Sequence, residues 1–151
     1  MACEFLSNPI QEVALNSPVL FTSSIPCRNG LVYHEDETGI FTLKGNTNQC
    51  FATYQVTFNG NVALPAEATD ILPIALAISV QGEPRVTSRA IFTPQAVSEF
   101  GNLTSTAIIK IPRGCCFSMA VEYVSAVSDP TVTPPPVIEV QNANLVISRI
   151  A

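Results

Sequence analysis

Residues 103–124, LTSTAIIKIPRGCCFSMAVEYV, decide the fold class because they contain two runs in which apolar side chains alternate with smaller or polar ones. The apolar positions that share a face are Leu103, Ala107, Ile109 and Ile111 in the first run and Phe117, Met119, Val121 and Tyr123 in the second. A period of two is typical of a half-buried β-strand. Between the runs, Pro112 has a fixed φ and Gly114 readily adopts a positive φ, which favours a tight turn. The stretch therefore predicts one antiparallel hairpin, in which the Pro-Arg-Gly turn sets the register of the two strands.

The same alternation recurs along the rest of the chain in short runs separated by turn-forming residues. Further strands are predicted at residues 12–23 (in two pieces), 31–34, 39–44, 50–64, 73–80, 85–92 and 137–150. Residues 93–101 predict one helical turn that opens near Pro94, and the proline-rich residues 128–136 predict an extended loop. Many short strands, almost no helix and no internal repeat predict an all-β antiparallel jelly-roll sandwich of about eight to ten strands.

The composition favours a chain that buries surface against other copies of itself. The 151 residues are 47% hydrophobic and 13% charged, whereas about a quarter of the residues of an ordinary soluble domain are charged. Residues 73–80 also place the small side chains of Ala75, Ala77 and Ser79 opposite a bulky apolar face. A strand that is apolar on both faces is covered on both, and a neighbouring subunit would supply the second cover. We therefore expect a homo-oligomer in which such small-residue faces pack between subunits.

The charge distribution and the termini argue against two classes of partner. The formal net charge is −5, and the seven Lys and Arg residues form no basic run, so we expect no nucleic-acid partner. No apolar stretch is long enough for a membrane span, so we expect no membrane partner. The first residues, MACEFLSNPIQEV, lack the basic start and the apolar core of a secretory signal. We therefore expect synthesis in a cytoplasm, whatever the final location of the protein.

Cysteine chemistry offers no metal site in this sequence. The five cysteines are Cys3, Cys27, Cys50, Cys115 and Cys116. They form no CxxC pair, and the chain has a single histidine, so the spacing of a zinc site is absent. An odd number of cysteines without a secretory signal favours free, mostly buried thiols. A vicinal disulfide at 115–116 and a crosslink between subunits through Cys3 or Cys27 remain alternatives.

No set of residues forms a catalytic motif. Glycoside hydrolysis needs two carboxylates that face each other across a cleft, and the candidate pairs are Glu67 with Asp70 and Glu99 with Glu122. Nothing else in the sequence distinguishes these carboxylates from ordinary surface charges. Cysteine–histidine catalysis would require His34 beside a cysteine. We therefore assign no catalytic, cofactor-binding or metal-binding residue, expect no cofactor, and predict that the protein is not an enzyme.

The acidic run that follows His34 is interpreted as a solvated loop tip. Residues 34–37 read His-Glu-Asp-Glu, and adjacent carboxylates do not provide the spaced ligands of a calcium loop. A histidine in this setting is expected to be exposed to solvent.

Sugar binding is a further possibility, because jelly rolls often carry sugar sites on their loops. The chain has no Trp and only three tyrosines. Tyr54 and Tyr123 share the parity of apolar neighbours and are predicted to lie in the core, which leaves Tyr33. Asn102-Leu103-Thr104 matches a glycosylation acceptor, but no secretory signal accompanies it.

Several longer segments resemble TNF-like jelly-roll domains. These segments are GIFTLKG (39–45), CFATYQVTFNGNVALP (50–65), ILPIALAISVQGEPR (71–85), LTSTAIIKIPRGCCFSMAVEYVS (103–125) and VIEVQNANLVISRI (137–150). The resemblance spans residues 30–151. It extends to the C-terminal domain of the collagen-like exosporium glycoprotein of Bacillus spores and to small virion proteins of Firmicutes phages. It implies a ten-stranded sandwich that assembles as a threefold symmetric homotrimer and does structural or adhesive work.

The resemblance also implies a division of the chain and a role. The Gly-X-Y stalk of the exosporium proteins is absent, so residues 1–25 are interpreted as an anchoring arm and residues 26–151 as the jelly-roll domain. The expected role is a capsid decoration or head-fibre knob on a phage virion surface, bound to the major capsid protein through residues 1–25. The alternative is a carbohydrate-binding adhesin or spore-surface module of the same trimeric fold, with surface glycans as partners, on a spore or cell surface. An enzyme on a jelly-roll scaffold is a third interpretation.

Overall fold

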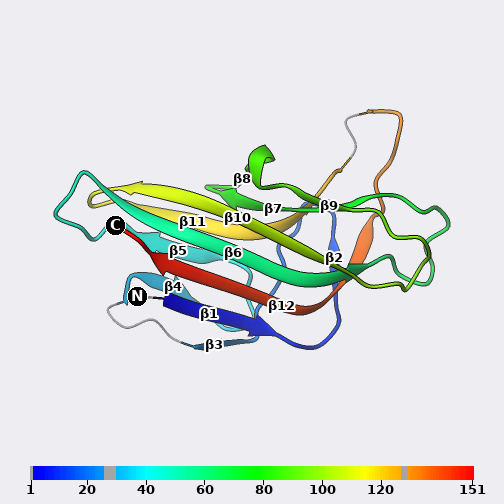
Figure 1. The fold of residues 1–151 in the computed structure, drawn as a ribbon, viewed down its shortest axis with the longest axis horizontal. Coiled ribbons are helices and arrows are strands. Elements are labelled where there is room, and N and C mark those ends of the chain that lie inside the picture. The colour runs from blue at the N-terminus through cyan, green and yellow to red at the C-terminus, as the bar shows by residue number, and fades with distance from the viewer. Residues whose placement is uncertain (1, 26–29, 127–128) are drawn as a thin grey trace.

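Two antiparallel β-sheets face each other and enclose the core (Figure 1). The computed structural model describes residues 2–25, 30–126 and 129–151, which contain twelve strands. The first sheet has the order β10 (Gly101–Pro112), β6 (Phe51–Ala63), β12 (Val137–Arg149), β1 (Ala2–Ser7) and β3 (Ser23–Ile25), with β2 (Gln11–Ala14) also paired to β12. The second sheet has the order β4 (Val32–His34), β5 (Phe41–Lys44), β11 (Cys116–Val124), β7 (Ile74–Val80) and β8 (Glu83–Pro84), with β9 (Ala90–Phe92) also paired to β7. The predicted all-β antiparallel sandwich is confirmed.

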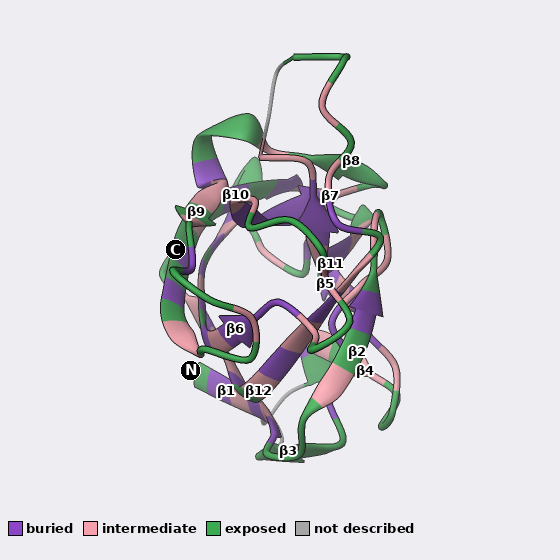
Figure 2. Cartoon of the chain, turned by 90° about the vertical axis from the view of Figure 1, so that its right-hand side faces the viewer, coloured by how far each residue is buried: buried purple, intermediate pink, exposed green. Residues whose placement is uncertain are grey.

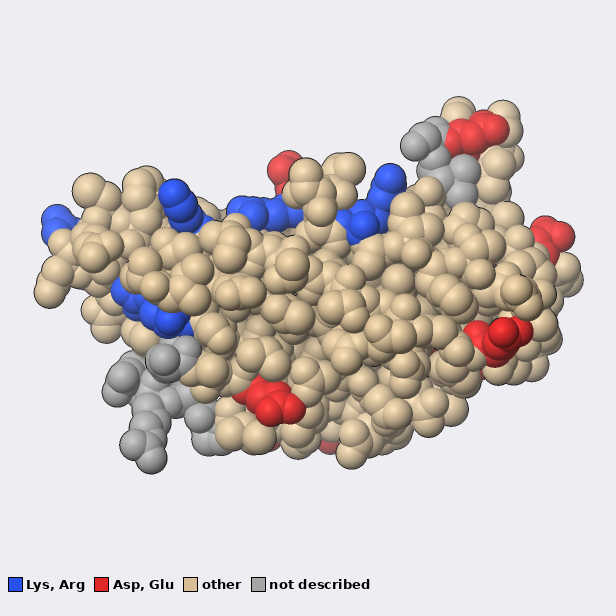
Figure 3. Space-filling view, viewed as in Figure 1, with Lys and Arg blue, Asp and Glu red and all other residues tan. Residues whose placement is uncertain are grey.

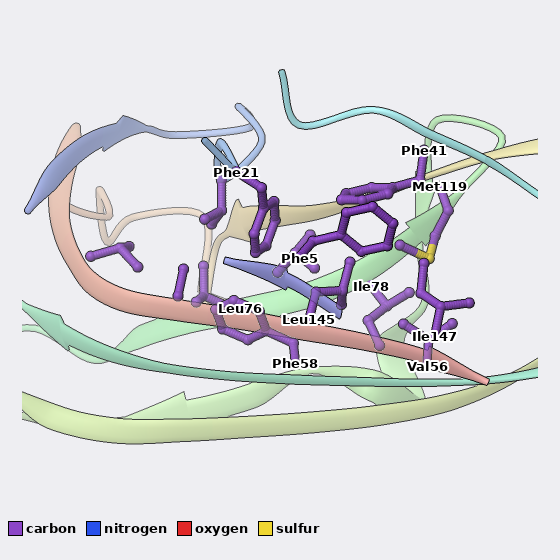
Figure 4. Packing of buried hydrophobic residues seen from close by; sticks show 14 of the residues in the cluster. Phe5, Phe21, Phe41, Val56, Phe58, Leu76, Ile78, Met119, Leu145 and Ile147 are labelled. Carbon is purple, nitrogen blue, oxygen red and sulfur yellow. The ribbon is translucent and has the colours of Figure 1, made fainter. Parts of the chain in front are cut away.

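The core forms where the apolar faces of the two sheets meet. Along β6 every second residue is buried, as the period-two pattern predicts, and the buried and exposed bands of the strands are visible in Figure 2. Three phenylalanines pack edge to face near the middle of the core (Figure 4). Their ring centroids are 4.7 Å apart between Phe5 and Phe41 and 5.5 Å apart between Phe21 and Phe41, within the range that favours aromatic pairs. One core thus connects β1, β5 and the segment before β3.

The strands β10 and β11 do not form the predicted hairpin. β10 pairs with β6 over its whole length in the first sheet, whereas β11 pairs with β5 and β7 in the second. The turn between them is closed by the Cys115 N–H, which donates to the Pro112 carbonyl over 3.0 Å, and Gly114 has the positive φ of +81°. The alternation and the turn are therefore present, but the turn carries the chain from one sheet to the other. The local sequence indicates where the chain reverses direction, but it does not indicate which strand will pair with the strand after the turn.

Residues 2–25 are not an arm separate from the sandwich. β1 pairs along its full length with β12 and also with β3. Cys3 and Phe5 are only 2% and 4% exposed. The expected boundary at residue 25 is therefore wrong, because residues 2–25 contribute three strands and part of the core to the domain itself.

The small-residue face of β7 is covered within a single chain. Ala75, Ala77 and Ser79 are at most 2% exposed. Val124 packs against the two alanines, and the Arg89 guanidinium reaches across to a backbone carbonyl at Ser125 over 3.3 Å. The expectation that a neighbouring subunit covers this face is therefore wrong.

Two shorter segments also differ from the sequence-based expectation. Residues 93–100 form bends and a turn rather than a helical turn, Gly101 already belongs to β10, and within 85–92 only Ala90–Phe92 is a strand. The preceding residues, Val86–Ser88, form the 3-10 helix η2. There the Ser88 hydroxyl occupies the edge of β7: it accepts a bond from the Ile78 N–H over 3.0 Å. The Ser88 side chain thus bonds the backbone of β7 at a position where a paired strand would otherwise do so. The alternation of residues 85–92 does not predict this arrangement.

The cysteines differ from the predicted set of free, buried thiols. Cys3 is buried and disulfide-bonded. Cys27 lies outside the described residues. The remaining cysteines, Cys50, Cys115 and Cys116, are free but exposed, and we call them the three exposed thiols. A vicinal disulfide at 115–116 is therefore not formed.

Candidate functional site

The outer face of the first sheet is open to solvent, and its middle is uncharged. We call this surface the open face. Its outward-pointing residues are Asn102, Thr104, Thr106, Ile108 and Lys110 on β10, Thr53, Gln55, Thr57, Asn59 and Asn61 on β6, Glu139, Gln141, Asn144, Val146 and Ser148 on β12, and Glu4 and Leu6 on β1. Its charged members are Glu4, Lys110 and Glu139, and the last two lie at opposite ends of the sheet. The face offers hydroxyl, amide and aliphatic groups across four adjacent strands.

Side chains on the open face hydrogen-bond to one another across strands. The Asn102 amide donates to the Asn59 carbonyl oxygen over 2.5 Å, and the Thr104 hydroxyl donates to the same oxygen over 3.3 Å. One step along the sheet, the hydroxyls of Thr57 and Thr106 are 3.2 Å apart. Cross-strand pairs of this kind stabilise a sheet modestly. They also satisfy polar groups that would otherwise require water.

A pocket of about 520 Å³ lies at one end of the sandwich, away from the β10–β11 turn. Two loops contribute most of its wall: the loop between β6 and β7 and the loop between β11 and β12. The lining residues are Glu12, Pro65, Glu67, Ala68, Thr69, Asp70, Leu72, Thr133, Pro134, Pro135, Pro136 and Val137. Its volume lies within the range of about 300–1,000 Å³ that is usual for small-ligand sites.

The proline wall of the pocket is attached to the core through Tyr123. Its hydroxyl donates to the Pro135 carbonyl over 2.6 Å, and the ring is fully buried. Burial raises the pKa of Tyr123 to about 12, because removal from water disfavours the phenolate. The next carbonyl, that of Pro136, accepts a bond from the Leu15 N–H over 3.0 Å. Two hydrogen bonds therefore fix consecutive prolines of the wall.

The start of the same loop is held by a local turn. The Asp129 carboxylate accepts bonds from the Thr131 N–H over 2.9 Å and from the Thr131 hydroxyl over 2.8 Å. The backbone bond, and after it the hydroxyl bond, lowers the pKa of the Asp129 carboxyl, because both stabilise the charged form. This turn orders the loop ahead of the proline run.

The structure brings together one of the two candidate carboxylate pairs. Glu67 and Asp70 both line the pocket, where Glu12 joins them. Glu122 instead accepts a bond from the Ser79 hydroxyl over 3.1 Å, and neither it nor Glu99 lines the pocket. The three pocket carboxylates are all exposed to solvent.

The tyrosines are distributed as predicted. Tyr54 and Tyr123 are fully buried, and Tyr33 on β4 is 59% exposed. The Tyr54 hydroxyl donates to the Lys44 carbonyl over 2.6 Å, and burial raises its pKa. Neither buried ring is available as a stacking surface for a sugar.

His34 is not the solvent-exposed residue that the sequence suggested. Its ring is stacked on Phe41 with centroids 4.3 Å apart, and it meets the Phe5 ring edge to face. The Nε2 atom lies 2.9 Å from the Thr38 carbonyl and donates to it, because a carbonyl only accepts. The buried Nδ1 atom has no hydrogen-bond partner. The acidic residues 35–37 are exposed, as predicted for a loop tip.

Two further classes of site are not found in the described part of the chain. Residues 2–25, 30–126 and 129–151 contain no group of three or more His, Cys, Asp or Glu side chains arranged to hold a metal ion. None of the helices within these ranges has the length and apolar character needed to cross a membrane.

Comparison with solved structures identifies the fold as a TNF/C1q-like jelly roll. The globular domain of zebrafish complement 1qA superposes with a TM-score of 0.66 at 16% identity, covering 99% of this chain and 97% of that domain. Eiger TNF from S. frugiperda superposes with a TM-score of 0.66 at 11% identity, covering 100% and 92%. Murine APRIL at pH 5.0 gives 0.60 at 10% identity, covering 98% and 99%.

Comparisons of the sequence alone add nothing to this assignment. No family model matches the chain, and no curated protein matches it in sequence. At these identities the structural likeness concerns the fold, and the function has to be argued from the surface of this chain.

Proposed function

We propose that this chain is a non-enzymatic, homotrimeric knob whose subunits meet through the open face of the first sheet. The observation that carries the proposal is that the middle of this surface is uncharged, because no outward-pointing side chain of β6 carries a charge and the charged Lys110 and Glu139 lie at opposite ends of the sheet. Burying charge is the main electrostatic penalty of association, and the uncharged middle of the open face limits that penalty. The resemblance to TNF-like domains supports the threefold arrangement.

The polar groups of the open face are suited to burial. Glu4 itself accepts a bond from the Asn144 amide over 2.6 Å, and the neighbouring amides and hydroxyls are bonded to one another. A polar group that already has a partner is less costly to remove from water than an unpaired one. Ile108, which is 47% exposed at the edge of the face, adds apolar surface that gains free energy on burial.

The specific role that we propose is decoration of a phage capsid, as a head-fibre or surface knob on the virion. Its support is the sequence resemblance to small virion proteins together with the knob-like domain. Residues 2–25 belong to the sandwich, so contact with a major capsid protein would use the surface of the folded domain rather than a free arm.

An adhesin of the same trimeric fold, on a spore or cell surface, is the second candidate. The observation that favours it is Phe51, which is 47% exposed and lies on the outward parity of β6 at one end of the open face. Aromatic rings beside amides and hydroxyls are typical of sugar sites. Phe51 is a weaker platform than Trp, which the chain lacks.

The oligomeric state tests the shared premise of both roles. Light scattering at micromolar concentration should give three times the mass of one chain. Thr57→Lys places a charge at the centre of the open face and should yield monomers, whereas Thr42→Lys, on the outward parity of β5 in the other sheet, should remain trimeric. A monomeric wild type, or a trimeric Thr57→Lys variant, would overturn the proposal.

The two roles are separated by their partners. A decoration protein should co-sediment with phage particles during purification and should show no specific glycan on an array. An adhesin should bind defined glycans and should lose that binding in Phe51→Ala, while the trimer persists. Absence from particles together with glycan binding would contradict the virion role.

A further inference from the structure

The pocket between the β6–β7 and β11–β12 loops combines an apolar wall with carboxylates of a single sign. Its charged lining residues are Glu12, Glu67 and Asp70, and no Lys, Arg or His is among them. The rest of the lining is prolines, aliphatic side chains and two threonines. We propose that this pocket binds an organic cation, an ammonium or guanidinium group carried on a short apolar stem. The proposal concerns a site that the trimer does not require.

The charge of the pocket selects the sign of the ligand. Three carboxylates at one cavity mouth repel anions and attract cations. Figure 3 shows Lys and Arg side chains along the upper edge and the left of the molecule, and several acidic side chains at the right-hand end, where both loops lie in the same view of Figure 1; other acidic side chains lie at the upper edge and the lower middle. No Lys, Arg or His side chain lines the pocket, so no positive group within the lining offsets the charge of its carboxylates.

The wall of the pocket selects an organic cation over a metal ion. Within the described ranges no group of side chains is arranged to hold a metal, so the carboxylates are not gathered around one ion. Pro65, Ala68, Leu72 and the proline run supply carbon surface instead. Such a surface buries methylene groups with a gain of about 0.8 kcal/mol each. An alkyl stem with one charged end matches both parts of the lining.

The cavity is formed before any ligand arrives. The Tyr123 hydroxyl and the Leu15 N–H hold the carbonyls of Pro135 and Pro136. On the opposite loop the Ala68 N–H donates to the Pro65 carbonyl over 3.0 Å. Prolines have little backbone freedom to lose, and a rigid site avoids the entropic cost of ordering loops upon binding. The pocket is therefore a preorganised cavity and not a chance gap between mobile loops.

Calorimetry with small probes tests the proposal directly. Hexylammonium and N-acetyl-lysine methylamide should both bind, whereas hexanol and N-acetyl-norleucine methylamide, which have the stem without the charge, should bind at least tenfold more weakly. A peptide with one lysine between glycines measures whether a protein side chain also reaches the site. Binding of the free amine alone assigns a small-molecule ligand, and binding of both probes assigns the side chain of a partner.

Matched variants separate the pocket from the overall negative charge. The double variant Glu67→Gln with Asp70→Asn should weaken hexylammonium binding at least tenfold. The control Glu35→Gln removes an equally exposed carboxylate from the loop tip at 34–37 and should leave the affinity unchanged. The altered side chains are exposed, so thermal unfolding should confirm that the variants are folded. Equal binding of hexanol, equal loss in the control, or no loss in the double variant would overturn the proposal. None of these outcomes depends on the trimer.

Discussion

Removal of the Tyr123 hydroxyl should destabilise the domain by a predictable amount. In Tyr123→Phe the buried ring is retained, but the bond of 2.6 Å to the Pro135 carbonyl is lost. A buried carbonyl left without its donor costs about 1–3 kcal/mol, and we take about 1.5 kcal/mol as the central value. For a domain of this size such a change lowers the Tm by about 3–6 °C.

The effect of the same variant should change with pH. The pKa of Tyr123 is about 12 in the folded protein and about 10 in an unfolded chain. The stability that this difference contributes is complete below pH 10 and is lost as the pH rises towards 12, because the unfolded state releases the proton first. By pH 11 the wild type should have lost about 1.4 kcal/mol from this group. The variant has no phenol at this position, so its stability should approach that of the wild type.

Urea unfolding of both proteins at pH 8 and pH 11 measures the two quantities. Tyr33→Phe, which removes an exposed hydroxyl, is the matched control and should differ little from the wild type at pH 8. A Tyr123→Phe variant as stable as the wild type at pH 8 would show that the hydrogen bond to the proline wall contributes nothing. A difference that stays constant up to pH 11 would refute the argument from burial.

Three further predictions address the termini, the thiols and the turns. The three exposed thiols should react with iodoacetamide in the folded protein, as seen by peptide mass spectrometry, while Cys3 reacts only after reduction and unfolding; native labelling of Cys3 would contradict its disulfide. Phe5→Ala should lower the free energy of unfolding, measured in urea, by about 3–5 kcal/mol. Ile10→Ala should lower it by much less, because the Ile10 side chain is 51% exposed. Similar losses in the two variants would place residues 2–7 outside the core. Gly45→Ala should be more destabilising than Gly82→Ala in thermal unfolding, because a Cβ at position 45 would collide with a backbone carbonyl. A Cβ at position 82 has free space, so Gly82→Ala should cost only about 1–2 kcal/mol, the penalty of an alanine at positive φ. The reverse order of stability would disprove this account.

The sequence by itself determined which segments are strands and which side of each strand is apolar. β6 is predicted at residues 50–64 and observed at Phe51–Ala63, with the predicted alternation of buried positions. Gln81 and Gly82 join β7 to β8, and both residues have positive φ as a two-residue hairpin turn requires. These features are local, since a period of two and the φ of a turn depend on residues close in the chain.

Tertiary structure alone decided which strands pair. The alternation of residues 103–124 is the same whether the two strands pair with each other or lie in opposite sheets, because periodicity specifies the face of a strand and not its neighbour. From the sequence alone, residues 1–25, which include β1, are interpreted as an arm. Nothing in a short terminal segment followed by Asn-Pro indicates that it lies between two other strands of a sheet. Its place beside β12 follows from contacts between residues at opposite ends of the chain, such as Cys3 with Ile147.

The existence of the pocket likewise could not be predicted from the local sequence. The proline run and the acidic pair Glu67 and Asp70 were each visible in the sequence, but nothing local places the β6–β7 loop beside the β11–β12 loop. Their meeting follows from the order of strands in the two sheets and from one hydrogen bond, donated by Tyr123 to Pro135. Local patterning thus determined the strands and their faces, and long-range pairing decided the sheets, the role of the N-terminal residues and the pocket.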